Sequence, residues 1–556
     1  MQIKEQDIRK AMVGLLAVSL IVRGVLAALL EFGNDEVYYW TYALYPDWSH
    51  FDHPPMVGLV MQLFSLNLLL DSEFFLRLAS VLFMTADTYI IYRIGKELKN
   101  AQTGFYAALL YNASIYAFVI TGIFIMPDTP LMLFWLLAFL SALRASPSKR
   151  GAGGSSLSSL RVIARNEAIQ KTGPSKLFLL LFGLFAGLAM LSKYSGIFLW
   201  VGMGLYILLF NRKQLKNPYL YLSLLISAIC CLPILYWNLQ NDFISFSFHS
   251  ERVGGNSLNP ATFGTELAGE FLYNNPVVFV LCIIAVVAAF KGRLAIGKSS
   301  LRLLLCITLP MIATFLSFSL MRPTLPHWNA PAYVLLILPA ACWLSDRTPA
   351  HECRIKLPKG ILAALGVMLF VVIVGSIEIQ TGFIPIDRHT EPEKLGRDDF
   401  TLDMYGWEQL ETKFATLREE KIAEGVMHEE DGIVADEWFP LANLDYYVAR
   451  PLGMRVMGIG YLEKLHKYVW INEERGGFRK GEDFWFLTDS RYYKRPEALY
   501  PGGFESIELI DTLTIERCGK PCKNFFVYAC KGLIYMQPTV SELIAQREAA
   551  KVDSEP

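Results

Sequence analysis

The sequence predicts a polytopic α-helical membrane protein that ends in a small soluble α/β domain. Hydrophobic residues make up 53% of the 556 residues, and the mean hydropathy is +0.34. Apolar runs recur through the first 377 residues, and they have too little polar surface to face water. After about residue 380 the apolar runs become short and charged residues become frequent. A soluble globular enzyme is therefore excluded for most of the chain.

Eleven apolar runs are expected to cross the membrane, although several are short for a span of about 20 residues. They are 11–31, 74–92, 103–121, 129–144, 176–192, 195–210, 218–236, 271–290, 301–320, 331–345 and 360–378. The first run is long for the apolar core of a signal peptide, and no small-residue cleavage site follows it. We therefore expect an uncleaved first span.

The basic residues indicate the topology of these spans. Alternate loops hold 24 lysines and arginines, whereas the opposite loops hold only Lys193, Arg252 and Arg322. The positive-inside rule then places the N-terminus in the cytoplasm. This requires the apolar segment 55–70 to return to its own side, so we expect an amphipathic or half-inserted helix at the outer interface. An odd number of crossings puts the soluble domain outside.

The chain is thus expected to contain a transmembrane domain, residues 1–378, and an extracytoplasmic α/β domain, residues 379–556. Within the first, the Gly/Ser-rich basic stretch 145–175 is typical of a flexible cytoplasmic linker. Within the second, 432–435 and 484–487 are expected as strands and 441–448 as a helix.

Three cysteines of the outer domain, Cys518, Cys522 and Cys530, leave the disulfide question open. An oxidising compartment would permit one disulfide among them, with one thiol left over. Their spacing lacks the second pair of a zinc ribbon, so a metal site there is not expected.

Acidic residues mark the outer ends of two predicted helices. Asp35 and Glu36 follow the first span, Asp52 and His53 come later in the same loop, and Asp128 begins a different span. Carboxylates that meet near cations would form an active site, whereas a solvated acidic loop is the alternative. The surrounding aromatic residues suit both a membrane interface and stacking on a sugar face: Tyr38, Tyr39, Trp40, Tyr42, Trp48 and Phe51.

Lys193 is the most unusual cation, because it lies between two apolar runs. A lysine at that depth costs about 2.5–3.5 kcal/mol unless it snorkels to the surface or meets an anion. Together with Arg252, Arg322 and His327 it would provide nearly all the outward-facing positive charge. A lipid phosphate is a natural counter-anion for such a group.

Several motifs resemble the bacterial integral-membrane glycosyltransferases of the GT-C class. The resemblance is closest to the protein mannosyltransferase-like group that includes the lipid A aminoarabinose transferases, of the glycosyltransferase family 83 type. The motifs have the order and spacing of that group over about residues 20–345, and the outer domain resembles it weakly from Asp436 to Tyr447. They are the segments 35–40, 51–57, 127–131, 187–194, 237–238 and 326–328.

The resemblance implies an enzyme of the bacterial cytoplasmic membrane. Such an enzyme moves a sugar from a polyprenyl-phosphate carrier to a lipid, glycan or protein acceptor at the outer face, with inversion at the anomeric carbon. By matching positions, Asp35 would be the catalytic carboxylate, and Glu36 lies beside it. Asp128 would position the sugar or the acceptor, and Lys193 and Tyr194 would lie at the phosphate.

One pair of residues departs from the family pattern. His53 stands where the aminoarabinose transferases carry a lysine, and Asp52 replaces the glutamate before it. Phosphate contact by His53 would then depend on pH, because an imidazole changes its charge near neutrality.

The same residues would also permit other functions. A transporter or flippase of lipid-linked sugars could use the same charges, but the unusual polar residues gather at outward loops rather than at mid-membrane. A signalling receptor would need a cytoplasmic effector module, which we do not recognise. No cofactor is certain: the acids could hold a divalent cation, but no histidine–carboxylate spacing requires one.

Overall fold

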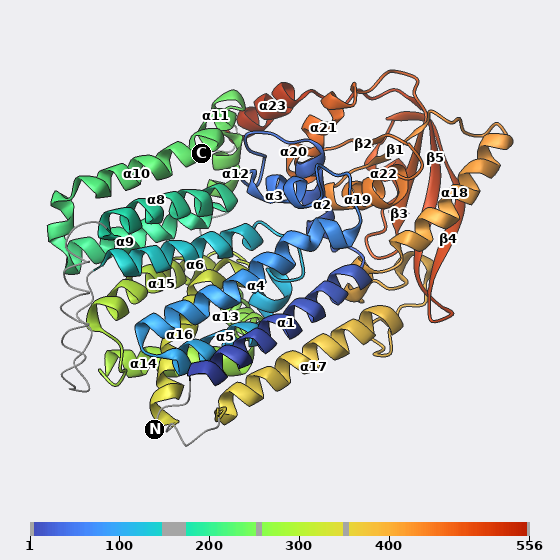
Figure 1. The fold of residues 1–556 in the computed structure, drawn as a ribbon. Coiled ribbons are helices and arrows are strands. Elements are labelled where there is room, and N and C mark those ends of the chain that lie inside the picture. The colour runs from blue at the N-terminus through green and yellow to red at the C-terminus, as the bar shows by residue number, and fades with distance from the viewer. Residues whose placement is uncertain (1–4, 147–173, 252–257, 349–354, 553–556) are drawn as a thin grey trace, which may run out of the picture. The chain divides into compact units, whose positions relative to one another are not determined.

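The computed structural model of the chain describes residues 5–146, 174–251, 258–348 and 355–552 (Figure 1). The predicted linker 145–175 therefore falls almost wholly outside the described residues. The chain divides into two compact units. Unit 1 consists of Met1–Ala28, His53–Leu239 and Ser245–Val371, and unit 2 of Leu29–Asp52, Gln240–Ile244 and Val372–Pro556.

Unit 1 is helical throughout its described residues, and short 3₁₀ or π turns join several of the helices. Its helices are α1 (Glu5–Leu29), α3 (Met56–Phe64), α4 (Glu73–Leu98), α5 (Ala101–Ala113), α6 (Asp128–Ala145), α8 (Pro174–Ser192), α9 (Phe198–Phe210), α10 (Pro218–Cys230), α11 (Leu232–Gln240), α12 (Ile244–Glu251), α13 (Pro260–Tyr273), α14 (Pro276–Phe290), α15 (Lys298–Ser319), α16 (Ala330–Arg347) and α17 (Lys359–Thr381), the last of which continues into unit 2.

Among the described residues, six helices are long and apolar enough to cross a membrane. They are α1, α4, α6, α8, α15 and α17, and the number rises to eight if two bent helix pairs each count as one span. A helix lies in each of the eleven predicted ranges, but α5 and α9 have only 13 residues each. At 1.5 Å per residue such a helix is about 20 Å long, which is shorter than the hydrocarbon core of a bilayer. The predicted count of eleven spans stays a prediction.

Two predicted spans are broken in the structure. Pro218–Cys230 and Leu232–Gln240 meet at an angle of 42°, and Pro260–Tyr273 and Pro276–Phe290 meet at 103°. At the second break Asn275 has a left-handed φ of 64° directly before Pro276, so the helix cannot continue. The span predicted over 271–290 therefore begins at Pro276, and its first residues belong to the preceding helix.

Segment 55–70 forms a short helix, in agreement with the expectation that it does not cross. Helix α3 has nine residues, and Leu66, Asn67 and Leu68 then have left-handed φ values of 54°, 58° and 62°. No helix of L-residues continues through such a run. The apolar segment is therefore divided into a helix of about 13 Å and a turn.

Close helix packing in unit 1 depends on small residues. Helices α4, α6, α8 and α10 pack against one another in that order (Figure 1). At Gly183 on α8 a Cβ atom would lie 2.2 Å from the carbonyl oxygen of Ser223 on α10. Only glycine therefore fits where these two backbones approach, as is common between membrane helices.

Gly202 on α9 offers a test of this packing. A Cβ atom there would lie 2.4 Å from the Cα atom of Ile307 on α15, whereas a Cβ at Gly204 would have no neighbour within 4 Å. We expect Gly202→Ala to lower the free energy of unfolding by about 1–3 kcal/mol, because backbone atoms must move. Gly204→Ala, its matched control on the same helix, should change it by less than about 0.5 kcal/mol. Thermal unfolding of the detergent-solubilised protein measures both, and equal effects would contradict the packing argument.

Unit 2 contains a five-stranded mixed sheet with helices around it (Figure 1). The strands are β1 (Gly432–Ala435), β2 (Val456–Gly458), β3 (Phe484–Asp489), β4 (Phe504–Arg517) and β5 (Lys520–Leu533). Their order in the sheet is β2-β1-β3-β5-β4, with β2, β1 and β3 parallel and β5 antiparallel to both β3 and β4. The predicted strands at 432–435 and 484–487 are thus present as β1 and β3.

The helices of unit 2 are short apart from three. They are α2 (Asn34–Leu44), α18 (Trp407–Ala423), α19 (Trp438–Asn443), α20 (Leu462–Leu465), α21 (Tyr468–Glu474), α22 (Pro496–Leu499) and α23 (Val540–Val552). The predicted helix at 441–448 corresponds to α19 and the π turn Leu444–Ala449 that follows it.

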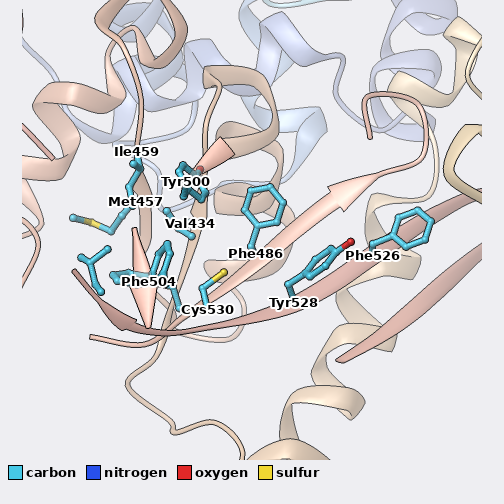
Figure 2. Packing of buried hydrophobic residues seen from close by; sticks show 11 residues of the cluster. Val434, Met457, Ile459, Phe486, Tyr500, Phe504, Phe526, Tyr528 and Cys530 are labelled. Atoms are coloured by element: carbon cyan, nitrogen blue, oxygen red, sulfur yellow. The ribbon is translucent and has the colours of Figure 1, made fainter. Parts of the chain in front are cut away.

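The core of unit 2 lies on the sheet. β1 is buried along its whole length and β3 along nearly all of it, as is usual for parallel strands covered on both faces. Figure 2 shows part of this core, with Val434, Phe486 and Tyr528 from three neighbouring strands. On β5, Tyr528 and Cys530 are two residues apart and so share one face of the strand. Cys518, Cys522 and Cys530 are all free thiols, and Cys530 is buried in this core.

The first part of the predicted outer loop, up to Asp52, belongs to unit 2, although the division by composition places it in 1–378. The backbone N–H of Trp407 donates to the Glu31 carboxylate at 2.9 Å, and that of Phe32 donates to the Tyr447 hydroxyl at 2.6 Å. The residues that carry the first acidic motif are therefore packed against helices that lie about 400 positions later in the chain. Composition could not reveal this, because the pairing depends on individual side chains.

Candidate active site

Asp128 and Lys193 form a buried ion pair in unit 1. The Lys193 Nζ lies 2.7 Å from Oδ2 of Asp128, and the side chains are 9% and 1% exposed. The Tyr116 hydroxyl donates to the other carboxylate oxygen at 2.8 Å. Asp128 begins α6 and Lys193 follows the last residue of α8, so the packing of these two helices brings them together.

His327 belongs to the same electrostatic group. It lies in the 3₁₀ turn Pro326–Trp328, and the charges of Lys193 and Asp128 both act on it. Desolvation and the Lys193 ammonium lower the pKa of His327 to about 4, although the charge of Asp128 opposes the shift. The imidazole is therefore neutral at pH 7 and offers hydrogen bonds rather than the positive charge that the sequence predicted.

One histidine lies beside Tyr194, the residue after Lys193, and a second lies beside that histidine. The ring of Tyr194 makes an edge contact with His249 on α12, with centroids 5.0 Å apart. The ring of His53 lies 6.2 Å from the same His249 ring. Three predicted site residues of unit 1, Lys193, Tyr194 and His53, are thus linked through neighbouring side chains.

The first acidic pair lies at the start of α2 in unit 2, and its two members differ in exposure. Asp35 is exposed in the first turn of the helix, whereas Glu36 is 1% exposed and its Oε2 accepts from the Gly33 backbone N–H at 3.1 Å. Glu36 therefore closes the helix N-terminus, which leaves Asp35 as the carboxylate that a substrate can reach.

Asp52 is held by two phenols of the same unit. Tyr38 donates to its Oδ1 at 2.8 Å, and Tyr42 donates to the same atom. Burial raises the pKa values of both tyrosines well above 10, and the Asp52 charge raises them further. Both phenols therefore stay protonated and fix the orientation of Asp52.

Lys467, at the start of α21, is a buried cation near this group. Its Nζ donates to the Tyr45 carbonyl and lies 3.0 Å from Nδ1 of His50. Desolvation lowers the pKa of Lys467 well below its usual value, and the charges of Asp47 and Asp52 oppose the shift.

Comparison with known proteins adds sequence relatives to this geometry. The family model described as dolichyl-phosphate-mannose-protein mannosyltransferase matches residues 52–157 and 157–237. Lipid A galacturonosyltransferase RgtD from Rhizobium johnstonii is 21% identical over 340 residues, which cover 60% of this chain and 63% of that protein. The chain thus spans less than two thirds of the length of this curated relative.

Solved structures show a likeness of fold. ArnT from Cupriavidus metallidurans bound to undecaprenyl phosphate has a TM-score of 0.57 at 15% identity, over 93% of this chain and 97% of that chain. Its apo state also has a TM-score of 0.57, at 14% identity over 94% and 98% of the two chains. The chain has the fold of the GT-C class and resembles glycosyltransferases of that class in sequence. It is a multi-pass membrane protein.

The aromatic motif of this GT-C chain has a packing role. Tyr38, Tyr39 and Trp40 are 1%, 5% and 2% exposed. The Tyr38 ring lies 4.9 Å from that of Trp438, and the Trp40 ring lies 5.2 Å from that of Tyr446. Buried rings have little surface left for a sugar, so these residues hold α2 in unit 2. Sequence pattern could not separate this role from sugar stacking, because both need the same residue types.

Of the two arginines predicted to belong to the site, only Arg322 lies among the described residues. Arg322 is exposed, and its guanidinium donates to the backbone carbonyl of Glu251 at the end of α12. Arg252 lies outside the described residues. A phosphate-binding role stays a prediction for both.

The sequence does not indicate that three polar residues lie near the predicted site residues. Tyr116 and His249 lie in otherwise ordinary helical sequence, and nothing local marks either as a partner of Asp128 or Tyr194. Lys467 follows His466 about 415 residues after Asp52, so only the fold could bring them together. Lys467 is unusual only for its burial, which the structure shows and the sequence does not.

Among the described residues, two groups of side chains are close enough to hold a metal ion, both in unit 2. One is Asp387, His389 and Asp398, and the other is His428, Asp431 and Asp483. Asp387 accepts from the backbone N–H of Gly396 at 2.9 Å, and Asp431 from that of His428 at 2.7 Å. These carboxylates therefore stabilise loops, and neither group contains a predicted site residue.

Proposed function

We propose that the chain transfers a glycosyl group from a polyprenyl-phosphate-linked sugar to an acceptor at the outer face of the bacterial cytoplasmic membrane, with inversion at the anomeric carbon. The observation that carries this proposal is the buried Asp128–Lys193 pair with its Tyr116 partner. A charged pair at a helix end of a membrane protein is expensive and usually functional.

Lys193 would stabilise the leaving group. A lipid phosphate leaves the anomeric carbon as an anion, so it needs a cation nearby more than it needs a proton. Asp128 keeps the ammonium charged and oriented until the donor arrives, and the donor phosphate then takes over part of that contact. Neutral His327 would add a hydrogen bond to the carrier or the sugar.

Asp35 would activate the acceptor. An acceptor hydroxyl or amine is a weak nucleophile, and a carboxylate on the attacking side takes its proton as the new glycosidic bond forms. Attack opposite to the departing phosphate inverts the anomeric carbon. This role requires Asp35 to approach the Asp128–Lys193 pair in the working enzyme, with unit 2 and the first loop on the outer side.

The relatives support the choice of donor and acceptor classes. The matched ArnT structure contains undecaprenyl phosphate, and the matched galacturonosyltransferase is named for lipid A. We propose undecaprenyl-phosphate-linked sugars as donors and lipid A, or another envelope glycolipid, as the first acceptor to examine.

Reconstitution tests the proposal. The purified chain in proteoliposomes should transfer sugar from undecaprenyl phosphate-galacturonic acid or undecaprenyl phosphate-aminoarabinose to lipid A, as measured by mass spectrometry. Envelope glycolipids from cells with and without the chain should differ by the same sugar mass. Transfer from a nucleotide sugar without a lipid carrier would contradict the proposed donor.

A further inference from the structure

A pocket lies at the sheet of unit 2, where the chain adds one strand on one side of β1 and the next strand on the other side. From β1 the chain goes to β2 on one side and later to β3 on the other, so β1 and β3 border the switch point of the parallel strands. In open α/β sheets, ligands bind at such a point, outside the carboxyl ends of the strands. A pocket that is partly open to solvent lies there, and we call it the sheet-end pocket.

Carboxyl groups line the sheet-end pocket. Asp436 and Glu437 directly follow β1, and Asp489 ends β3. Lys494 bridges the first two, with its Nζ 2.6 Å from Asp436 and 3.0 Å from Glu437. Glu437 also pairs with the Lys464 ammonium, so these two carboxylates share two ammonium groups.

The charge of the pocket selects its ligand. Burial tends to raise the pKa of Glu437, but the ammonium groups of Lys464 and Lys494 outweigh it and lower that pKa. Glu437 is therefore ionised at neutral pH. Sites that bind nucleotides at a switch point carry a glycine-rich turn after the first strand, whereas this chain has Asp436 and Glu437 there. A phosphate or uronate would have to compete with these two carboxylates for the ammonium groups of Lys464 and Lys494.

Aromatic rings complete the pocket. Tyr492 is 40% exposed, and its ring makes an edge contact with that of Phe439, with centroids 4.9 Å apart. Fixed carboxylates accept hydrogen bonds from hydroxyl and ammonium groups, and a half-exposed ring offers an apolar face to C–H groups. We infer that the sheet-end pocket binds a neutral or amine-bearing saccharide, through residues other than those of the proposed catalytic group.

Binding to the full-length protein in detergent tests this inference. The probes are neutral trisaccharides of glucose, galactose or mannose, a glucosamine trimer and a galacturonic acid trimer. In saturation-transfer NMR, at least one neutral probe or the glucosamine trimer should bind, and the galacturonic acid trimer should bind at least tenfold more weakly. Asp436→Asn combined with Glu437→Gln should weaken the positive probe about tenfold or more, because hydrogen bonds to charged groups are lost.

Matched variants separate binding from folding. Glu429→Gln combined with Glu430→Gln removes the same charge from exposed positions of unit 2 and should leave binding unchanged. Tyr492→Ala removes a half-exposed ring without changing either partner of the Lys494 ion pairs and should also weaken binding. The catalytic variant Asp128→Asn should still bind the probe, so this inference and the proposed function can fail separately. Binding to none of the neutral or amine probes, equal binding of the anionic trimer, or unchanged affinity in both pocket variants would overturn it.

Discussion

Replacing Lys193 by methionine should reduce glycosyl transfer by at least about a hundredfold, because its ammonium group then no longer stabilises the departing phosphate. The same change should lower the free energy of unfolding by about 3–5 kcal/mol, since it leaves the buried carboxylate of Asp128 without its partner. Transfer rates in proteoliposomes and thermal unfolding in detergent measure the two effects on the same preparations.

The double variant separates the two effects. Asp128→Asn combined with Lys193→Met replaces the ion pair by two neutral side chains, which can be nearly neutral for stability. We expect most of the lost stability to return while transfer stays absent. A double variant that transfers sugar at the wild-type rate would reduce the pair to a structural contact.

Replacing Asp35 by asparagine should reduce transfer by about a hundredfold to ten-thousandfold, the usual contribution of a general base. The exposed side chain leaves little stability to lose, so the thermal midpoint should stay within about 1 °C of wild type. Asp47→Asn, at an exposed aspartate of the same loop, is the matched control and should keep its activity. Normal turnover of Asp35→Asn with a lipid-linked donor would refute the assignment.

The Asp128–Lys193 contact shows what the sequence could predict. Both residues flank apolar runs, and charge placement assigns both to the outer side, so the amino-acid sequence is enough to expect their approach. The helices themselves, α6 and α8, begin and end within two residues of the predicted ranges. Long, uninterrupted apolar runs leave little choice of structure.

The bends and the partners of the acidic loop could not be predicted in the same way. Hydropathy averages over many residues, so it does not detect the break at Asn275, which depends on one φ angle and a proline. Strand β4 could not be predicted in this way, because most of its residues are exposed or only half-buried and therefore lack a clear apolar pattern. Whether Asp35 meets Asp128 stays a prediction, since they belong to different units.

The pairing of residues 29–52 with the last third of the chain also bears on biogenesis. Tyr38 on α2 contacts Trp438, and the flanking residues Phe32 and Tyr45 contact Tyr447 and Lys467. These partners leave the ribosome more than 390 residues after Asp35. The segment that carries the first acidic motif can therefore complete its packing only after these later residues have been synthesised. A chain that stops before them could still form its apolar helices, but residues 29–52 would lack the partners that hold them in unit 2.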